Sequence, residues 1–192
     1  MADLDDFFNL RVTDFRGSLG VEWVNFDPKW HDYYSFKTGA KKPKPQHGVC
    51  YRVTSGRRKT DFIGDDLAPL ISEDAYEVFK KYRFSGWSTY PVKIIDRQSN
   101  VFPVKYFGLA ILGRSGPMDM TRGVKETFKQ KDGKLAILSM DGLFFDLESW
   151  DGSDFFVLKD SGFLLVTKRV VDALKCSGLV GWTERELKDV CI

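Results

Sequence analysis

Four carboxylates fall within one nine-residue segment and are the residues best spaced to do chemistry: Asp146, Glu148, Asp151 and Asp154. Oxygen ligands of this kind bind Ca²⁺, and a pair of carboxylates can divide the acid and base steps of a hydrolase. The calcium-loop pattern, however, needs alternating acids before a Gly and a distant Glu, and a Ser-Trp pair interrupts the run here. A turn at Asp151-Gly152, closed by side-chain hydrogen bonds to free amides, explains the same residues without a ligand. The hydrolase hypothesis requires at least two of these carboxylates to converge in a cleft.

Histidine and cysteine chemistry is limited by number and spacing. The chain has two histidines, His31 and His47, so a metal site built on several imidazoles is excluded. In His47-Gly-Val-Cys50 a base stands near a thiol, but residues three apart on a strand point to opposite faces. The three cysteines, Cys50, Cys176 and Cys191, lack C-x-x-C spacing, which argues against a zinc site and a disulfide framework. We expect no metal and no cofactor.

A glycine-containing loop, Gly113-Arg-Ser-Gly-Pro117, follows an apolar stretch, which is where phosphate-binding loops are found. It has neither the lysine and spacing of a Walker loop nor the three glycines of a dinucleotide fingerprint. Gly and Pro at these positions instead predict a turn that ends the strand. Arg114 stays open as a single anion contact.

Two basic segments, Lys37–Pro45 and Arg57–Lys59, raise the alternative of a nucleic-acid or anion-binding module. Neither segment is periodic, so both are predicted to be loops. Nucleic-acid binding would need their charges to converge on one face beside aromatics such as Trp30, Tyr33 and Tyr34. The formal net charge is only +2, so no global field draws the chain towards nucleic acid or anionic lipid. Nucleic acid is therefore not the expected partner.

The composition of the chain is that of a globular protein, whose strands and helices must position these residues. A chain of 192 residues with 43% hydrophobic and 15% aromatic residues fits one domain, 1–192, with a sheet-rich core. Within it, residues 1–66 are expected to form strands and loops, and residues 67–192 the more regular part. The acidic start lacks the basic region and apolar run of a secretory signal, and no window approaches about 18 apolar residues. We expect a cytoplasmic protein without a membrane partner.

One segment recurs at a constant offset of 95 without a gap, as Leu70–Trp87 and Leu165–Trp182. Ser72 and Thr167 are N-cap candidates that can accept from the free amides of a first helical turn. Apolar residues then follow helical spacing, and Gly-Trp ends each copy with a turn and a strand. Each copy predicts a strand, a short amphipathic helix and a second strand. An internal pseudo-repeat and the chance recurrence of a common unit both explain the offset.

Further strands are predicted at residues 19–26, 49–54, 90–95 and 104–112. Asp-Gly dipeptides at Asp132, Asp141 and Asp151 are hairpin signals, and they separate short strands at 134–140, 143–147 and 154–158. This spacing predicts a meander. Two short amphipathic helices against a largely antiparallel sheet give the predicted fold class, α+β.

The C-terminal part resembles a known family. Trp150-Asp-Gly-Ser-Asp-Phe-Phe156 is followed by the apolar run Phe163–Val166, and then by Thr167-Lys-Arg-Val170, Ala173-Leu174 and Leu179-Val-Gly181. This order is similar to the pattern that closes the chain in bacterial immunity proteins of polymorphic toxin systems, in particular the myxobacterial-type immunity family once described as a domain of unknown function. Residues 70–87 resemble the comparable upstream unit, so the resemblance covers roughly residues 67–190. Residues 1–66 show no pattern of that family.

The resemblance implies a cytoplasmic protein that binds and neutralises a cognate toxin, and it brings no catalytic residues with it. A binding protein needs exposed aromatic and charged anchors. The candidate anchors are Trp30, Tyr33, Tyr34, Trp150, Asp151 and Asp154. The hydrolase and the nucleic-acid module remain the alternatives.

Overall fold

The computed structural model describes residues 3–13, 16–29, 31–44, 48–66, 68–129, 135–159 and 161–192. The chain is 41% strand and 18% helix with mostly antiparallel sheets, so the predicted α+β fold class is confirmed. The helices are α1 (Tyr33–Lys37), α2 (Glu73–Lys81) and α3 (Lys168–Cys176), with 3₁₀ turns at η1 (Leu4–Asp6), η3 (Leu147–Ser149) and η4 (Leu187–Asp189). The first of these helices was not predicted.

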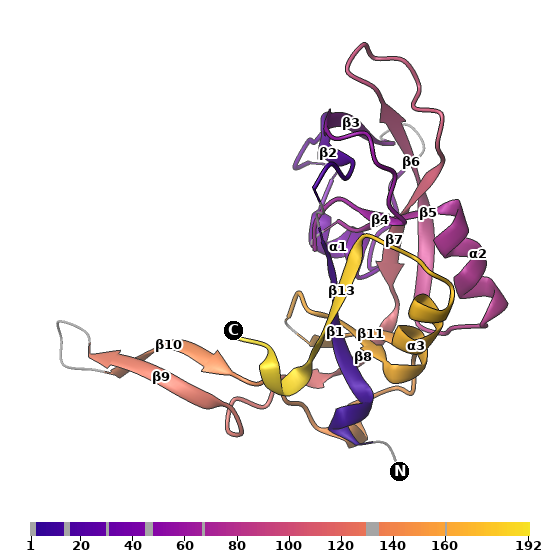
Figure 1. Ribbon diagram of the computed structural model, residues 1–192. Coiled ribbons are helices and arrows are strands. Elements are labelled where there is room, and N and C mark those ends of the chain that lie inside the picture. The colour runs from indigo at the N-terminus through magenta and orange to yellow at the C-terminus, as the bar shows by residue number, and fades with distance from the viewer. Residues whose placement is uncertain are drawn as a thin grey trace.

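The strands form two large sheets and one detached pair (Figure 1). The five-stranded sheet has the order β13 (Trp182–Glu186), β1 (Phe7–Val12), β12 (Leu164–Thr167), β11 (Phe155–Lys159) and β8 (Gly113–Pro117). The six-stranded sheet has the order β2 (Gly20–Trp23), β3 (Val49–Ser55), β6 (Trp87–Ile95), β7 (Tyr106–Ile111), β5 (Leu70–Ser72) and β4 (Phe62–Ile63). The detached pair is β9 (Val124–Lys129) and β10 (Leu135–Asp141). Only the β3–β6 and β8–β11 pairings are parallel among these strands.

The same four-strand unit is present in both large sheets. We call β4, β5, α2, β6 and β7 the first unit, and β11, β12, α3, β13 and β1 the second unit. Their strand orders, β4-β5-β7-β6 and β11-β12-β1-β13, match, and all neighbours within them are antiparallel. Adding 95 to the bounds of α2, 73–81, gives those of α3, 168–176. The predicted pseudo-repeat is therefore a repeat of structure.

The second unit is completed by a strand from the start of the chain. Ser72 lies opposite Tyr106 of β7, and its counterpart Thr167 lies opposite Phe7 of β1. At the other end of these strands Trp87 pairs with Ile111, while Trp182 pairs with Val12. Thus β1 occupies in the second unit the position of β7 in the first. It belongs to the region 1–66, yet it lies between two strands of the region 67–192.

Details of local geometry repeat as well. The indole nitrogen of Trp87 donates to the carbonyl of Phe84 at 3.0 Å, and that of Trp182 donates to the carbonyl of Leu179 at 2.8 Å. Gly86 and Gly181 both have positive φ, 79° and 97°, and a Cβ at either would clash with a neighbouring carbonyl oxygen. Glycine is needed at both turns because only it adopts this backbone at no steric cost.

The two predicted N-caps differ. The hydroxyl of Ser72 accepts from the amide of Ala75 at 3.1 Å, as predicted. Thr167 occupies the cap position of α3, but its hydroxyl donates to Asp154 Oδ1 at 3.1 Å and makes no cap hydrogen bond. The predicted cap hydrogen bond at Thr167 is therefore wrong, and the hydroxyl of this residue is hydrogen-bonded to Asp154 instead.

Apolar burial follows the two units. A central cluster joins them, since it contains Phe79 and Ala75 of α2 as well as Val170 and Leu174 of α3. Figure 1 shows these two helices side by side on one flank of the molecule. A second cluster packs the other face of the first unit against β2, α1 and β3, and a third packs the second unit against residues 143–150 and the C-terminal segment.

The predicted meander is wrong. Of its three strands, residues 134–140 and 154–158 correspond to β10 and β11, but these lie in different sheets. Residues 143–147 form no strand, and Phe145 makes only an isolated bridge to Met118. Gly142 and Gly152 sit in turns with positive φ, while Asp132-Gly133 lies outside the described residues. An Asp-Gly turn reverses the chain, but it does not fix which strand becomes the neighbour.

In the part of the chain that the structure describes, no helix has the length and apolar character needed to cross a membrane.

Candidate functional site

Three of the four carboxylates of the acidic segment lie at the surface. Asp146 caps η3, where its Oδ1 accepts from the amide of Glu148 at 3.1 Å. Asp151 accepts from the amide of Arg114 at 2.7 Å and from that of Ser153 at 3.0 Å, which closes the predicted turn. Glu148 is exposed. These contacts are the local side-chain hydrogen bonds that the turn hypothesis requires.

Asp154 is the buried member of the segment and links the two units. Its carboxylate accepts from the amide of Ser85 at 2.9 Å, in the turn after α2. It also accepts from Thr167, and Arg169 of α3 donates to Oδ2 at 2.9 Å. Asp61 makes the equivalent contacts in the other direction, because its carboxylate accepts from Ser72 and from the amide of Val180 at 2.8 Å. Each Asp therefore binds the cap of its own unit and the turn of the other.

The carboxylates of the acidic segment do not gather in a cleft. Within the described residues, no group of three or more His, Cys, Asp or Glu side chains is close enough to hold a metal ion. All three cysteines are free. Asp146, Asp151 and Asp154 are thus placed for capping, for turn closure and for joining the units, respectively.

The predicted anchors are spread over the molecule. Tyr34 is exposed on α1, whereas Tyr33 packs its ring 4.7 Å from Trp23. Trp150 is half-buried, with its ring edge-on to Phe7 at 4.9 Å. Trp30 lies outside the described residues. These residues do not form one surface with Asp154, which is buried.

Two of the basic residues singled out in the sequence, Arg114 and Lys41, have side-chain contacts within the fold. The guanidinium of Arg114 donates to the carbonyls of Ile111 and Gly113, each at 2.8 Å, and to that of Thr38. It ties β8 to the end of α1 and is occupied by carbonyl oxygens. In the basic loops, Lys41 pairs with Asp32 at 3.9 Å.

Among the lysines whose exposure the structure describes, one is buried. Lys37, at the end of α1, is 1% exposed, and its Nζ donates to the carbonyl of Gly162 at 2.5 Å and to that of Asp66. Burial lowers the pKa of Lys37 to about 8, while the carboxylates of Asp66 and Asp65 act in the opposite direction. The side chain joins α1 to loops that border both units, so it is part of the internal framework.

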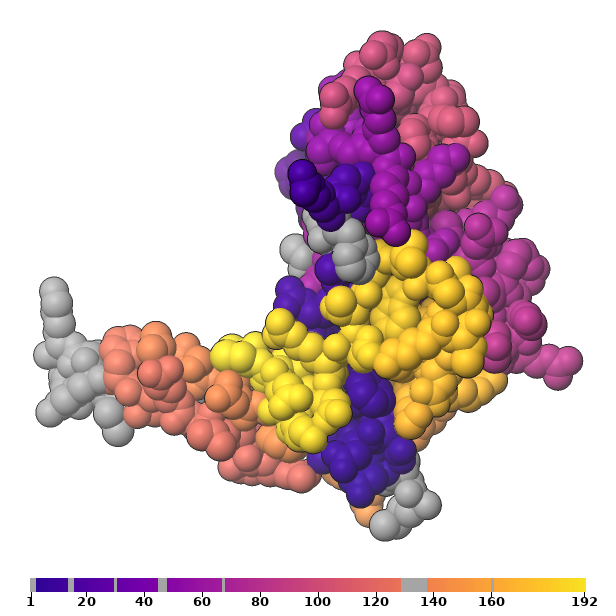
Figure 2. Space-filling model, viewed as in Figure 1, coloured from indigo at the N-terminus to yellow at the C-terminus, as the bar shows by residue number. Residues whose placement is uncertain are grey.

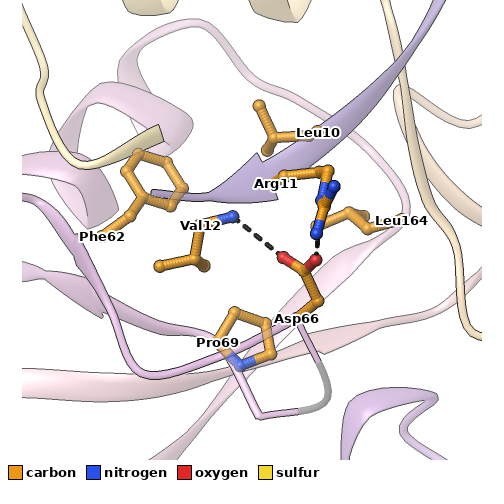
Figure 3. Close-up of a pocket in the computed structure, with 7 residues that line it drawn as sticks. All are labelled: Leu10, Arg11, Val12, Phe62, Asp66, Pro69 and Leu164. Carbon is orange, nitrogen blue, oxygen red and sulfur yellow. Dashed lines mark hydrogen bonds and ion pairs between the residues drawn. The ribbon is translucent and has the colours of Figure 1, made fainter. Parts of the chain in front are cut away.

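Asp66 borders two cavities: an open pocket of about 340 Å³, which it shares with Asn9 and Arg185, and a small cavity on the side of Phe62 that has no room for a ligand. Figure 3 shows the carboxylate of Asp66 facing β1, where it accepts from Arg11 Nε at 2.9 Å and from the amide of Val12 at 3.0 Å. The walls of the small cavity are apolar, with Leu10 and Phe62 among them, and it measures about 10 Å³. About 10 to 15 Å³ is needed for a single water molecule. The small cavity is a packing gap beside an ion pair.

The detached pair β9–β10 takes no part in the contacts, described above, that hold the two units together. Figures 1 and 2 show it projecting away from both sheets as an arm. We define the arm as residues 120–129 and 135–141. Its base is held at two points: the amide of Asp119 donates to the carbonyl of Phe144 at 2.7 Å, and Met140 and Ile192 exchange main-chain hydrogen bonds of 3.0 and 2.9 Å.

The arm exposes apolar side chains on both strands. Large exposed hydrophobic residues lie along it: Met120, Val124, Phe128 and Leu138. Val124 is 75% exposed and Leu138 is 61% exposed, and every residue from 124 to 128 is classed as exposed. A two-stranded ribbon alone in water is marginally stable at best. Exposed apolar residues gathered on one projecting element are typical of a protein-binding surface.

The β9 side of the arm carries the net charge of the molecule. Residues 120–129 contain three Lys or Arg and one Glu, a net charge of +2, which equals that of the whole chain. The other residues balance at 26 of each sign. An arm with this charge favours a partner surface that is acidic.

The sequence analysis missed this site because β9 was not predicted. Its residues, Val124-Lys-Glu-Thr-Phe-Lys129, are too polar for a core strand. The available signal was the Asp132-Gly133 dipeptide, with a β-compatible segment on either side. Pairing 124–129 with 135–141 across it would have predicted a hairpin, though not its projection from the body.

Comparison with known proteins does not assign the chain to a family. No protein-family model matches the chain, and a search of curated proteins finds no significant match.

Proposed function

We propose that this chain is an immunity protein that binds a toxin protein and neutralises it by forming a stable complex. The observation that carries the proposal is the arm, a projecting ribbon on which Val124, Phe128 and Leu138 are exposed. A partner that covers these side chains would gain their burial free energy, about 25 cal/mol per Å² of apolar surface. The toxin is the partner class because of the family resemblance in residues 67–190.

The rest of the molecule supports a binding role. Most of the residues that carry the resemblance lie in the two units and their helices, where they serve the core and the turns. A rigid body with a projecting recognition element suits a protein that acts by occupying a surface. In this proposal the protein works in the cytoplasm, where free cysteines remain reduced.

The direct test uses the product of the adjacent gene. We expect the purified chain to form a stable complex with a toxin encoded next to it, and its co-expression to restore growth to cells that make the toxin. If no complex and no rescue is seen with a toxin that is itself active, the proposal is wrong.

The arm is tested by a matched pair of substitutions. Val124→Thr together with Phe128→Thr keeps strand-favouring residues but removes apolar contact area, so we expect affinity for the toxin to fall by about tenfold or more. Val101 is the control, because it is 70% exposed, close to the 75% of Val124, and lies outside the arm. Val101→Thr should leave the affinity unchanged. Equal losses in both variants would remove the arm from the interface.

A further inference from the structure

We propose that the outer edge of β9 receives an extended, acidic segment of the partner protein, which adds to the arm as a third strand. This inference rests on the proposed function and specifies how the arm binds. Three features of the arm indicate what kind of segment binds there: the strand edge that has no neighbour among the described strands, the exposed apolar side chains, and the net charge.

The two edges of the arm differ. At its base, β10 is already covered on the outside, since Met140 is bonded to Ile192 and Asp141 forms a bridge with Cys191. The same strand has a bulge at Leu138, where the register shifts between Ile137 and Ser139. Bulges and covered edges are the usual means by which proteins prevent strand addition. The β10 edge is therefore protected.

The β9 edge lacks these protections. It runs from Val124 to Lys129 without a bulge or a proline, and among the described strands only β10 pairs with it. A regular edge of this length presents outward N–H and C=O groups to an added strand. The ladder would be extended by main-chain hydrogen bonds, which do not depend on side-chain fit.

An added third strand would also cover apolar side chains of β9 that are exposed in the free protein. Val124, Glu126 and Phe128 lie on one face of β9, and Lys125 and Thr127 lie on the other, because successive side chains alternate. Glu126 accepts a hydrogen bond from Ser139 of β10 at 3.1 Å, so its carboxylate is held towards β10. Side chains of the added strand would cover Val124 and Phe128 from the open side. Three strands with an apolar face are stable where two are marginal.

The positive charge of the arm favours an acidic segment as the added strand. Residues 120–129 carry three basic residues and one acidic residue, and Lys125 is exposed on the open edge strand. Lysine on an edge discourages indiscriminate pairing, and it favours a strand that places a carboxylate beside it. A second copy of the same arm would bring two positive arms together, which like-charge repulsion opposes.

The first measurement is amide hydrogen exchange on the chain with and without the toxin. In the free protein, alternate amides of β9 should exchange rapidly, since they point away from β10. In the complex we expect exchange at these positions to slow by about tenfold or more, which corresponds to about 1.4 kcal/mol. Tight binding without protection in residues 124–128 would overturn strand addition and leave the proposed function intact.

The second measurement separates the main chain from the side chains. Glu126 and Thr127 are adjacent, so one of their amides faces outward, and exchange in the free protein identifies it. Proline there removes a donor from the edge without touching the β9–β10 ladder. We expect that proline variant to bind the toxin about tenfold more weakly, while alanine at the same position binds within about threefold of the wild type. Equal affinities for both would contradict the proposal.

Other outcomes identify other occupants. If the wild-type chain does not bind its toxin, the proposed function fails, and this inference fails with it. If β9 is protected in the toxin-free chain at high concentration and the chain sediments as a dimer, the occupant is a second copy. If the chain binds duplex DNA with an affinity that falls steeply with salt, the arm recognises phosphate instead. Each of these results would overturn strand addition by a partner protein.

Discussion

At the scale of single residues, Asp154 illustrates why a cluster of carboxylates need not be a catalytic site. It accepts hydrogen bonds from the amide of Ser85 and the guanidinium of Arg169, in two different units. Its counterpart Asp61 does the same for Ser72 and Val180. A carboxylate suits this position because it accepts several bonds at once.

We therefore predict that Asp154→Ala lowers the free energy of unfolding by about 2 to 4 kcal/mol, because buried donors lose their acceptor. Asp172 is the control, since it pairs with Lys168 at 2.6 Å on the exposed face of α3. Asp172→Ala should cost less than about 1 kcal/mol. Urea unfolding followed by circular dichroism measures both, and equal effects would contradict the linking role of Asp154.

Lys37 provides a pH-dependent test. Burial lowers the pKa of Lys37 to about 8, from an ordinary value of 10.5. Between these two pH values the unfolded chain keeps on Lys37 a proton that the folded chain has lost. Raising the pH through this range therefore favours folding. We expect the free energy of unfolding to rise by up to about 2 kcal/mol between about pH 8 and about pH 9.5 through this residue.

The comparison variant is Lys37→Met, which should show a flatter dependence over the same range. It should also be less stable below about pH 8, since the carbonyls of Asp66 and Gly162 lose their donor, at a cost of about 1 to 3 kcal/mol. The range ends below the titration of Tyr106, whose pKa burial raises to about 12. Parallel pH curves for both proteins would show that Lys37 does not titrate there.

At the scale of elements, the arm contributes little to the body. Its base is fixed by the bridge between Met118 and Phe145 and by the pairing of Met140 with Ile192, while residues 124–128 are exposed. An element that buries so little apolar surface adds little to stability.

We predict that replacing residues 122–139 with a short Gly-Ser turn changes the free energy of unfolding by less than about 1 kcal/mol. The same variant should lose toxin binding and rescue. Thermal unfolding and the co-expression assay give the two readings. A loss of several kcal/mol would mean that the arm has packing contacts of its own with the body.

At the scale of the whole molecule, the two units share one core. Phe79 of the first unit is fully buried and lies 4.8 Å from Phe155 of the second, between ring centroids. The units also exchange the contacts of Asp61 and Asp154. Neither unit buries its apolar face without the other.

Unfolding should therefore be a single transition. We predict that Phe79→Ala costs about 3 to 5 kcal/mol and lowers the exchange protection of α3 as much as that of α2. An isolated peptide of residues 60–112 should remain unfolded. Independent melting of the two helices would show instead that the units are separate folding domains.

The sequence by itself determined the local elements. Caps, helical spacing and Gly-Trp turns gave α2 and α3 with the correct offset of 95, because these signals act within one turn or one helix. It also predicted the turn at Asp151-Gly152. Strands with a clear apolar run, such as β3 and β7, were predicted for the same reason.

Only the tertiary structure decided which strands are neighbours and what remains exposed. The place of β1 in the second unit depends on a pairing between the two ends of the chain, which no local pattern records. The hydroxyl of Thr167 is hydrogen-bonded to Asp154, a residue distant from the helix in sequence, and makes no cap hydrogen bond. Val124 and Phe128 could have been core residues by type. They are exposed because the sheets close without them, and burial is a property of the whole packed chain rather than of the residue.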